Sequence, residues 1–322
     1  MSDAARRDGL RIGVTLGDPR GIGPEIAADA ARRLRAGTSH QLVFIGPRGT
    51  GAESAADEFH AIGDWRGGGA AAAGLLAGRA IDAAVERALS HDLDALVTAP
   101  IDKAALHAAG YDFAGHTEML AARTGALDVA MFMVAERTAL GGPLRVTLAT
   151  THIALAEVPR ALTTERLVAQ SRLTAQGLRE SWGVRAPRIA LCALNPHASD
   201  GGRFGSEEAR VYAPALAQLR EDGIGVTGPV PADTVFLRAA RGEFDAVIAP
   251  YHDVGMAAFK TASFGQGVNV TLGLPFPRTS PDHGTALDIA GTGCADPSSM
   301  LEALQLAARL AAARRGQVTV ES

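Results

Sequence analysis

The sequence has few cysteines, little net charge and no long apolar run, and each shortage excludes a class of protein. Only Cys192 and Cys294 occur in 322 residues, so a disulfide framework is excluded and reduced thiols are expected. The net charge of −4 supplies no basic surface for nucleic acid or an anionic membrane. Apolar runs end before the roughly 18 residues of a transmembrane helix, and residues 1–10 lack a signal-peptide core. We therefore expect a cytoplasmic protein that binds neither nucleic acid nor membrane.

What the sequence contains is an alternation of apolar, β-branched runs with helical segments. With 47% hydrophobic and 20% charged residues, the chain is long enough for two globular domains. The alternation predicts an α/β fold with a largely parallel sheet. Residues 46–74 are expected to form a loop and a helix entrance, and Arg278 is expected to lie in a loop. Strands are predicted at 11–16, 41–45, 95–98, 129–134, 145–151, 188–194, 224–227, 246–249 and 268–271, and helices at about 75–90, 163–182 and 297–315.

Three histidines follow three of the predicted strands. RVTLATTH ends in His152, RIALCALNPH in His197 and DAVIAPYH in His252. If these strands share one edge of a sheet, three imidazoles converge, as a divalent metal such as Zn²⁺ prefers. Asp233 and Asp253 are nearby carboxylates that could complete or orient the set. The alternative, that each histidine only hydrogen-bonds a loop, stays open.

A second group of side chains suits an anionic ligand. Its members are donors that follow glycine or stand at predicted helix starts, which favours a carboxylate or phosphate. For a lone lysine or arginine, a solvated surface charge is the alternative. The group consists of His116, Thr117, Lys260, Asn269 and Arg278.

The segment DHGTALDIAG, residues 282–291, can wrap a nucleotide with backbone donors. Asp288 could accept a hydrogen bond from a ribose hydroxyl and repel a 2′-phosphate. A glycine-punctuated helix entrance is the alternative. Neither a Rossmann G-x-G-x-x-G in the right frame nor a Walker motif occurs, and the G-x-S-x-G of a serine nucleophile is also missing. Cys192 is interpreted as a core residue of its strand.

Taken together, the motifs TLGDPRGIGPE, TAPIDK, GHTE, ATTH, LNPHASDGGRFG, PADT, YHDVG and GVNVTLGLPFPRTSPDHGT resemble the 4-hydroxythreonine-4-phosphate dehydrogenase family. They occur in family order from residue 15 to about 295. The resemblance implies an isocitrate/isopropylmalate dehydrogenase-like fold of two α/β/α domains with an interdomain cleft. It implies a discontinuous nucleotide-binding domain, 1–128 plus 253–322, and a metal-binding and dimerisation domain, 129–252. It also implies a homodimer with a shared active site.

The same resemblance assigns roles by matching position. It implies NAD, with NADP as the alternative, and a divalent metal, Zn or Mg, Co or Mn, with the third metal ligand coming from the partner subunit. Proton handling falls to Asp233 and, as a second candidate, to Lys103. The implied metal ligands are His152, His197 and His252; the substrate contacts are His116, Thr117, Lys260, Asn269 and Arg278; the cofactor contacts are His283, Gly284, Thr285 and Asp288.

The implied reaction is the oxidation of 4-phosphohydroxy-L-threonine with decarboxylation to 3-amino-2-oxopropyl phosphate. Val254 stands where the family commonly has glutamine, and Ala99 and Asp102 stand where biosynthetic members often have glycine and histidine. These details resemble paralogues that oxidise 4-phospho-D-erythronate or 4-phospho-D-threonate to dihydroxyacetone phosphate. A metal-dependent hydrolase or acyl or phosphoryl transferase, and a catalytically silent binding protein, are the alternatives from other classes.

Overall fold

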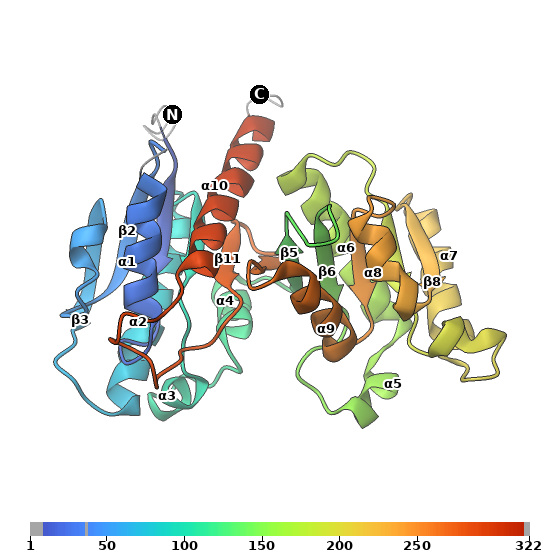
Figure 1. The fold of residues 1–322 in the computed structure, drawn as a ribbon, viewed down its shortest axis with the longest axis horizontal. Coiled ribbons are helices and arrows are strands. Elements are labelled where there is room, and N and C mark those ends of the chain that lie inside the picture. Colours follow the sequence, from blue (N-terminus) through green and yellow to red (C-terminus); the bar gives the residue numbers. More distant parts are fainter. Residues whose placement is uncertain (1–8, 36–37, 319–322) are drawn as a thin grey trace. The chain divides into compact units, whose positions relative to one another are not determined.

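The computed structural model describes residues 9–35 and 38–318, and the chain forms two compact units (Figure 1). Unit 1 comprises Met1–Leu127 and Val268–Ser322, and unit 2 comprises Asp128–Gly267. The chain therefore returns to unit 1 at Val268, whereas the sequence analysis drew this boundary at 253; the difference is the helix α9 (His252–Ser263). Residues 1–8, on which the signal-peptide prediction partly rested, lie outside the described residues.

The sheet of unit 1 has its strands in the order β3-β2-β1-β4-β11-β10. Neighbouring strands are parallel except β10 and β11, which are antiparallel. Two of them correct the sequence analysis, because β3 lies within the segment expected to be a loop and β11 begins at Arg278. The strands are β1 (Arg11–Thr15), β2 (Gln41–Arg48), β3 (Glu58–Asp64), β4 (Ala95–Thr98), β10 (Val268–Leu272) and β11 (Arg278–Pro281).

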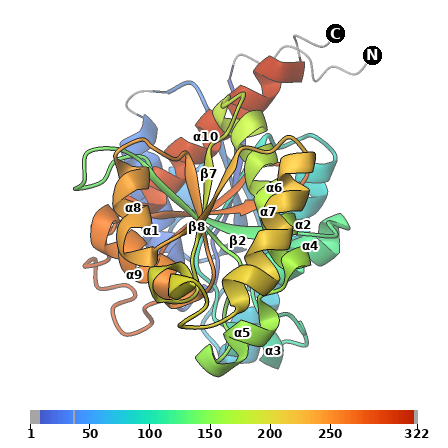
Figure 2. The same ribbon diagram turned by 90° about the vertical axis from the view of Figure 1, so that its right-hand side faces the viewer.

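Helices cover both faces of this sheet. α1 (Gly23–Leu34) and α10 (Ser298–Val318) pack against each other on one face, and α2 (Ala70–Leu89) covers the other (Figure 2). Right-handed crossovers explain why the helices divide between the two faces. The chain moves across the sheet in one direction from β1 through α1 to β2, and in the opposite direction from β3 through α2 to β4. Three shorter helices complete unit 1. η3 (Glu53–Ala55) follows β2, and α3 (Lys103–Ala108) and α4 (His116–Thr124) follow β4.

The strands of unit 2 follow the order β5-β6-β9-β7-β8. β5 and β6 form an antiparallel pair, and β6, β9, β7 and β8 are parallel. α6 and α7 lie on one face of this sheet and α8 and α9 on the other (Figure 2). The elements are β5 (Ala130–Ala135), β6 (Leu144–Leu148), η4 (Leu155–Glu157), α5 (Val158–Ala161), α6 (Thr164–Trp182), β7 (Ile189–Cys192), η5 (Pro196–Asp200), η6 (Glu208–Tyr212), α7 (Ala213–Glu221), β8 (Val226–Val230), α8 (Ala232–Ala240) and β9 (Ala246–Ala249).

The neighbouring strands β7 and β9 of unit 2 are apolar along their whole length, as expected of strands that helices bury on both faces. All four residues of β9 are buried, and Cys192 at the end of β7 is a core residue, as predicted. Phe259 of α9 is fully buried against this core, and burial of such a side chain stabilises the fold by roughly 1.5–3 kcal/mol. Within the described part of the chain, no helix is long and apolar enough to cross a membrane.

Candidate active site

The three strands that precede the candidate metal ligands are neighbours in the sheet of unit 2. β9 lies between β6 and β7, and all three run parallel. His152 follows β6, His197 follows β7, and His252 opens α9 directly after β9. Since the carboxyl ends of parallel strands share one edge, the fold brings the three histidine-bearing segments to the same edge.

Two of the histidines face each other at this edge. The rings of His152 and His252 have centroids 5.6 Å apart. Two imidazoles that bind one ion through Zn–N bonds of about 2 Å place their ring centres roughly 5 Å apart, so the spacing suits a shared cation. His252 Nδ1 lies 2.7 Å from Asp253 Oδ1, which leaves Nε2 for a metal. A cavity of about 160 Å³ adjoins the pair, and Thr150, Thr151 and Tyr251 line it further.

His197 does not join this pair within one chain. Among residues 9–35 and 38–318, no three His, Cys, Asp or Glu side chains lie close enough together to hold a metal ion. A single chain therefore brings together two of the three expected metal ligands, His152 and His252. The third ligand stays a prediction that rests on a second subunit.

The loops that carry His152 and His197 contain residues with positive φ angles. His152 has φ 39° and His197 has φ 51°, in the left-handed region that non-glycine residues rarely occupy. Such conformations persist only where the surroundings hold them, and they gather at functional sites. For His197 the left-handed run continues through Ala198, Ser199 and Asp200.

The candidate anion site in unit 1 is built around Arg278, which is 2% exposed. Its guanidinium donates to Thr98 Oγ1 at 2.6 and 3.2 Å and to Thr271 Oγ1 at 2.9 Å. Burial lowers the pKa of Arg278 to about 10, although the negative charge of Glu118 opposes the shift. The group remains a cation at neutral pH, and these three hydrogen bonds of its guanidinium go to neutral hydroxyls.

Two further predicted substrate contacts have buried polar atoms without a protein partner. His116 Nε2 and Asn269 Oδ1 are both buried, and neither has a hydrogen-bond partner among the residues that the structure describes. Burial, and secondly the charge of Arg278, hold the pKa of His116 well below its usual value, so its imidazole is neutral. Buried polar atoms are nearly always paired, so these two fit a ligand that supplies the missing partners. Thr117 is half-buried in the first turn of α4.

Unit 1 also contains an ion-pair network that the sequence analysis missed. Arg20 pairs with Asp18 at 2.6 Å and with Asp102 at 2.9 Å, and Asp18 is fully buried. Asp102 also caps α3 by accepting from the backbone N–H of Ala104. The sequence signal for this network is the order Asp18-Pro19-Arg20 after β1, because an Asp and an Arg two residues apart can form a local ion pair. Lys103, exposed at the start of α3, lies beside Gly115.

The candidate nucleotide loop rests on the start of α1. Ile22 donates its N–H to Thr285 O at 2.9 Å, and Gly291 donates to Glu25 Oε1 at 3.3 Å. A Cβ at Gly21 would stand 2.7 Å from Thr285 O, so only glycine permits this approach. His283 Nε2 is buried and has no hydrogen-bond partner within residues 9–35 and 38–318, and Gly284 and Asp288 are exposed. The ring nitrogen of His283 and the exposed backbone of Gly284 could therefore form hydrogen bonds to a nucleotide.

The remaining two candidates lie in unit 2. Lys260 is exposed on α9. Asp233 is exposed in the first turn of α8, and its charge, together with the larger effect of burial, raises the pKa of Cys192 at the end of β7 to about 12. Asp233 thus lies near the strand that leads to His197. The predicted residues are divided between the two units.

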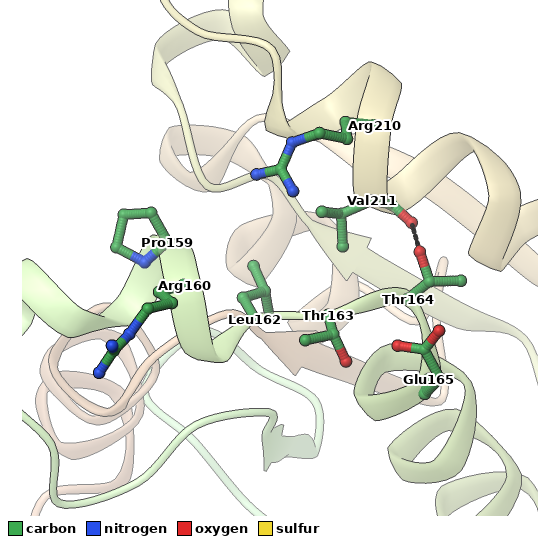
Figure 3. Close-up of a pocket in the computed structure, with 8 residues that line it drawn as sticks. All are labelled: Pro159, Arg160, Leu162, Thr163, Thr164, Glu165, Arg210 and Val211. Carbon is green, nitrogen blue, oxygen red and sulfur yellow. Dashed lines mark hydrogen bonds between the residues drawn. The ribbon is translucent and has the colours of Figure 1, made fainter.

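A larger hollow of about 520 Å³ holds none of the predicted site residues (Figure 3). It lies at the start of α6, where Thr164 Oγ1 donates to Val211 O at 3.1 Å. Arg160 beside it is 85% exposed and paired with Glu157. The hollow is therefore a surface feature, and the predicted site residues lie outside it.

Comparison with known proteins places this geometry in a family. The sequence model described as "Pyridoxal phosphate biosynthetic protein PdxA" matches residues 32–307. A 4-hydroxythreonine-4-phosphate dehydrogenase from Aromatoleum aromaticum is 44% identical over 92% of this chain and 95% of its own. The crystal structure of the enzyme of that name from Klebsiella pneumoniae is 38% identical, with a TM-score of 0.82 over 94% of this chain and 100% of its own.

A more distant structure bears on the fold alone. A β-decarboxylating dehydrogenase from Thermococcus kodakarensis is 16% identical, with a TM-score of 0.53 over 96% of this chain and 88% of its own. The expected class of α/β fold is confirmed.

Proposed function

Because the chain belongs to the family of PdxA pyridoxal phosphate biosynthetic proteins, we propose that it is a 4-hydroxythreonine-4-phosphate dehydrogenase. It oxidises the CH–OH group of 4-phosphohydroxy-L-threonine, and decarboxylation then gives 3-amino-2-oxopropyl phosphate. The observation that carries the proposal is 44% identity over 92% of the chain to a relative of that name. It works in the cytoplasm as a homodimer with a shared active site.

The histidines of unit 2 hold a divalent cation, Zn²⁺ or one of Mg²⁺, Co²⁺ and Mn²⁺. When bound, such a cation lowers the pKa of the substrate hydroxyl and stabilises charge on the ketone oxygen. The facing rings of His152 and His252 support this assignment, as does the carboxylate of Asp253 on the far nitrogen of His252. His197 completes the set, and one of the three ligands comes from the partner subunit.

The loop that carries His283, Gly284, Thr285 and Asp288 binds NAD, with NADP as the alternative. When bound, NAD would supply the hydride acceptor for this oxidation. The docking of Thr285 O on the N–H of Ile22 holds the loop at the start of α1. From its exposed position, Asp288 accepts from a ribose hydroxyl and repels a 2′-phosphate.

The substrate's anionic groups are held by Arg278, His116, Thr117, Asn269 and Lys260. Arg278 offers a charge that its threonine partners do not neutralise, and neutral His116 offers a hydrogen bond without adding a second buried cation. Asp233 takes the proton of the hydroxyl, with Lys103 as the second candidate. Both are exposed, which suits exchange of the proton with water.

The paralogous reaction is the second candidate, on the observation that Asp102 and Ala99 stand where biosynthetic members often have histidine and glycine. Here Asp102 pairs with Arg20 and caps α3, so the position is built into the structure. The substrates would then be 4-phospho-D-erythronate or 4-phospho-D-threonate. A hydrolase or transferase, or a silent binding protein, would have no use for the nucleotide loop.

One assay separates these candidates. Protein stripped of metal and then reloaded is offered NAD with 4-phosphohydroxy-L-threonine, 4-phospho-D-erythronate or 4-phospho-D-threonate, and NADH absorbance is followed. We expect metal-dependent turnover of the amino acid phosphate. Turnover of a sugar acid alone would make the protein a paralogue, and bound metal without NADH from any substrate would overturn the dehydrogenase assignment.

A further inference from the structure

The loop that carries His197 has a backbone that needs support. Residues His197, Ala198, Ser199 and Asp200 all have positive φ, between 44° and 68°, and Gly201 and Gly202 extend the run. A run of left-handed, non-glycine residues is disfavoured in a free peptide. Surrounding groups must therefore fix the conformation in which His197 is presented.

Glu208 supplies that support on both sides of His197. Its Oε1 accepts the backbone N–H of Leu194 at 3.0 Å and of Asn195 at 2.7 Å. Its Oε2 accepts from Asn195 Nδ2 at 2.9 Å and from the hydroxyl of Ser199. The carboxylate thus spans from the two residues before Pro196 to the second residue after His197.

The surroundings of Glu208 fit this single task. The residue is 6% exposed, and no ion pair to it is found in the described part of the chain, so the hydrogen bonds to the loop stabilise its charge. It begins the π-helix η6, and four residues later Tyr212, also buried, donates its hydroxyl to Cys192 O at 2.9 Å. The wide turn directs both side chains to the end of β7, and π-helical turns are common at functional sites.

We propose that Glu208 is a positioning residue that holds His197 in the orientation required for metal binding. The inference rests on the proposed function, because it takes His197 as a ligand of the divalent cation. Glu208 acts on His197 through its hydrogen bonds to Leu194, Asn195 and Ser199 of the loop. In other metal sites, loss of the groups that orient a ligand weakens the metal by roughly 10- to 100-fold.

The test compares Glu208→Gln with the matched control Glu207→Gln in the full-length protein. Glutamine keeps the shape of the side chain, but its amide nitrogen cannot accept the bonds that one carboxylate oxygen now accepts. Glu207 accepts a hydrogen bond from the loop at Asn195 Nδ2, at 2.8 Å. Zn²⁺ is titrated into metal-stripped protein by calorimetry, at a temperature at which circular dichroism shows each variant to be folded.

We expect the Kd for Zn²⁺ to rise roughly 10- to 100-fold in Glu208→Gln and less than about twofold in Glu207→Gln. Ser199→Ala, which removes one donor to Glu208, should weaken Zn²⁺ in the same direction by less, and it serves as the second variant if Glu208→Gln does not fold. A lower melting temperature of the metal-free variants with an unchanged Kd would reduce Glu208 to a structural residue and overturn the inference. Wild-type protein that binds no Zn²⁺ would instead refute the metal site itself, and the inference with it.

Discussion

At the scale of single residues, burial and a neighbouring cation act together on His116. Both disfavour the imidazolium, burial more strongly, so the pKa of His116 lies well below its usual value. In the unfolded chain the pKa returns to about 6.5. The unfolded state therefore binds a proton that the folded state does not, and the contribution of His116 to stability falls as the pH drops below about 6.5.

The variant Arg278→Gln separates the two causes. Removal of the cation should raise the pKa of His116, but burial should still keep it below the usual value. An NMR titration of the His116 ring in the wild type and the variant measures both effects. Arg123→Gln, at an exposed position of the same helix α4, is the control and should leave the titration unchanged. An unaltered pKa in Arg278→Gln would contradict the role of the guanidinium.

The second prediction at this scale concerns Arg20. Its substitution by alanine leaves Asp18 fully buried without its cation, so we expect the free energy of unfolding to fall by roughly 2–4 kcal/mol. Urea unfolding measures the change. Arg32→Ala removes an exposed pair with Asp29 instead and should cost less than about 1 kcal/mol. Equal losses in the two variants would show that burial of Asp18 has no effect.

At the scale of elements, the sequence predicted the short apolar strands most sharply and missed β3 and β11. β4 and β9 are four-residue apolar runs, and both were predicted with the bounds the structure has. β3 is an edge strand of mixed, half-exposed residues, and β11 has the sequence RTSP. Such strands are formed by pairing with neighbours distant in sequence, which a local pattern does not contain.

The same distinction applies to the candidate site. The edge shared by His152, His197 and His252 could be predicted, because each histidine follows an apolar run and parallel strands align their ends. The burial of Arg278 could not be predicted, because its partner Thr98 is 180 residues away. The role of Glu208 could not be predicted either, since its hydrogen bonds depend on how the His197 loop folds back.

A prediction at this scale concerns the docking of the nucleotide loop on α1. In Gly21→Ala the new Cβ would stand 2.7 Å from the backbone oxygen of Thr285, so the loop must shift. We expect the KM for NAD to rise about tenfold, which corresponds to about 1.4 kcal/mol of binding, with a smaller change in kcat. Gly69→Ala, which meets nothing within 4 Å at the N-cap of α2, is the control. An unchanged KM for NAD in Gly21→Ala would contradict the assignment of this loop to NAD binding.

At the scale of the whole molecule, one chain does not supply a complete metal site. His152 and His252 face each other, but no third His, Cys, Asp or Glu side chain in the described residues joins them. A two-fold dimer would resolve this, because two-fold symmetry lets each subunit supply a ligand to its partner's site and receive one in return. The exposed apolar residues Ile153, Leu155 and Phe204, next to His152 and in the His197 loop, are available for such an interface.

Mixed dimers test whether the site is shared. The variants His197→Ala and His252→Ala should each be inactive as homodimers. If these two ligands come from different subunits, a dimer of one chain of each kind has both mutations in one site and none in the other. Random pairing on co-expression then restores about a quarter of the wild-type activity, since half of the dimers are mixed and each has one intact site. Two affinity tags isolate the mixed dimer, in which about half of the activity should return, with about one tightly bound metal ion per dimer. If both ligands came from one chain, every site in the mixed dimer would lack a histidine, and neither activity nor tight metal binding would return.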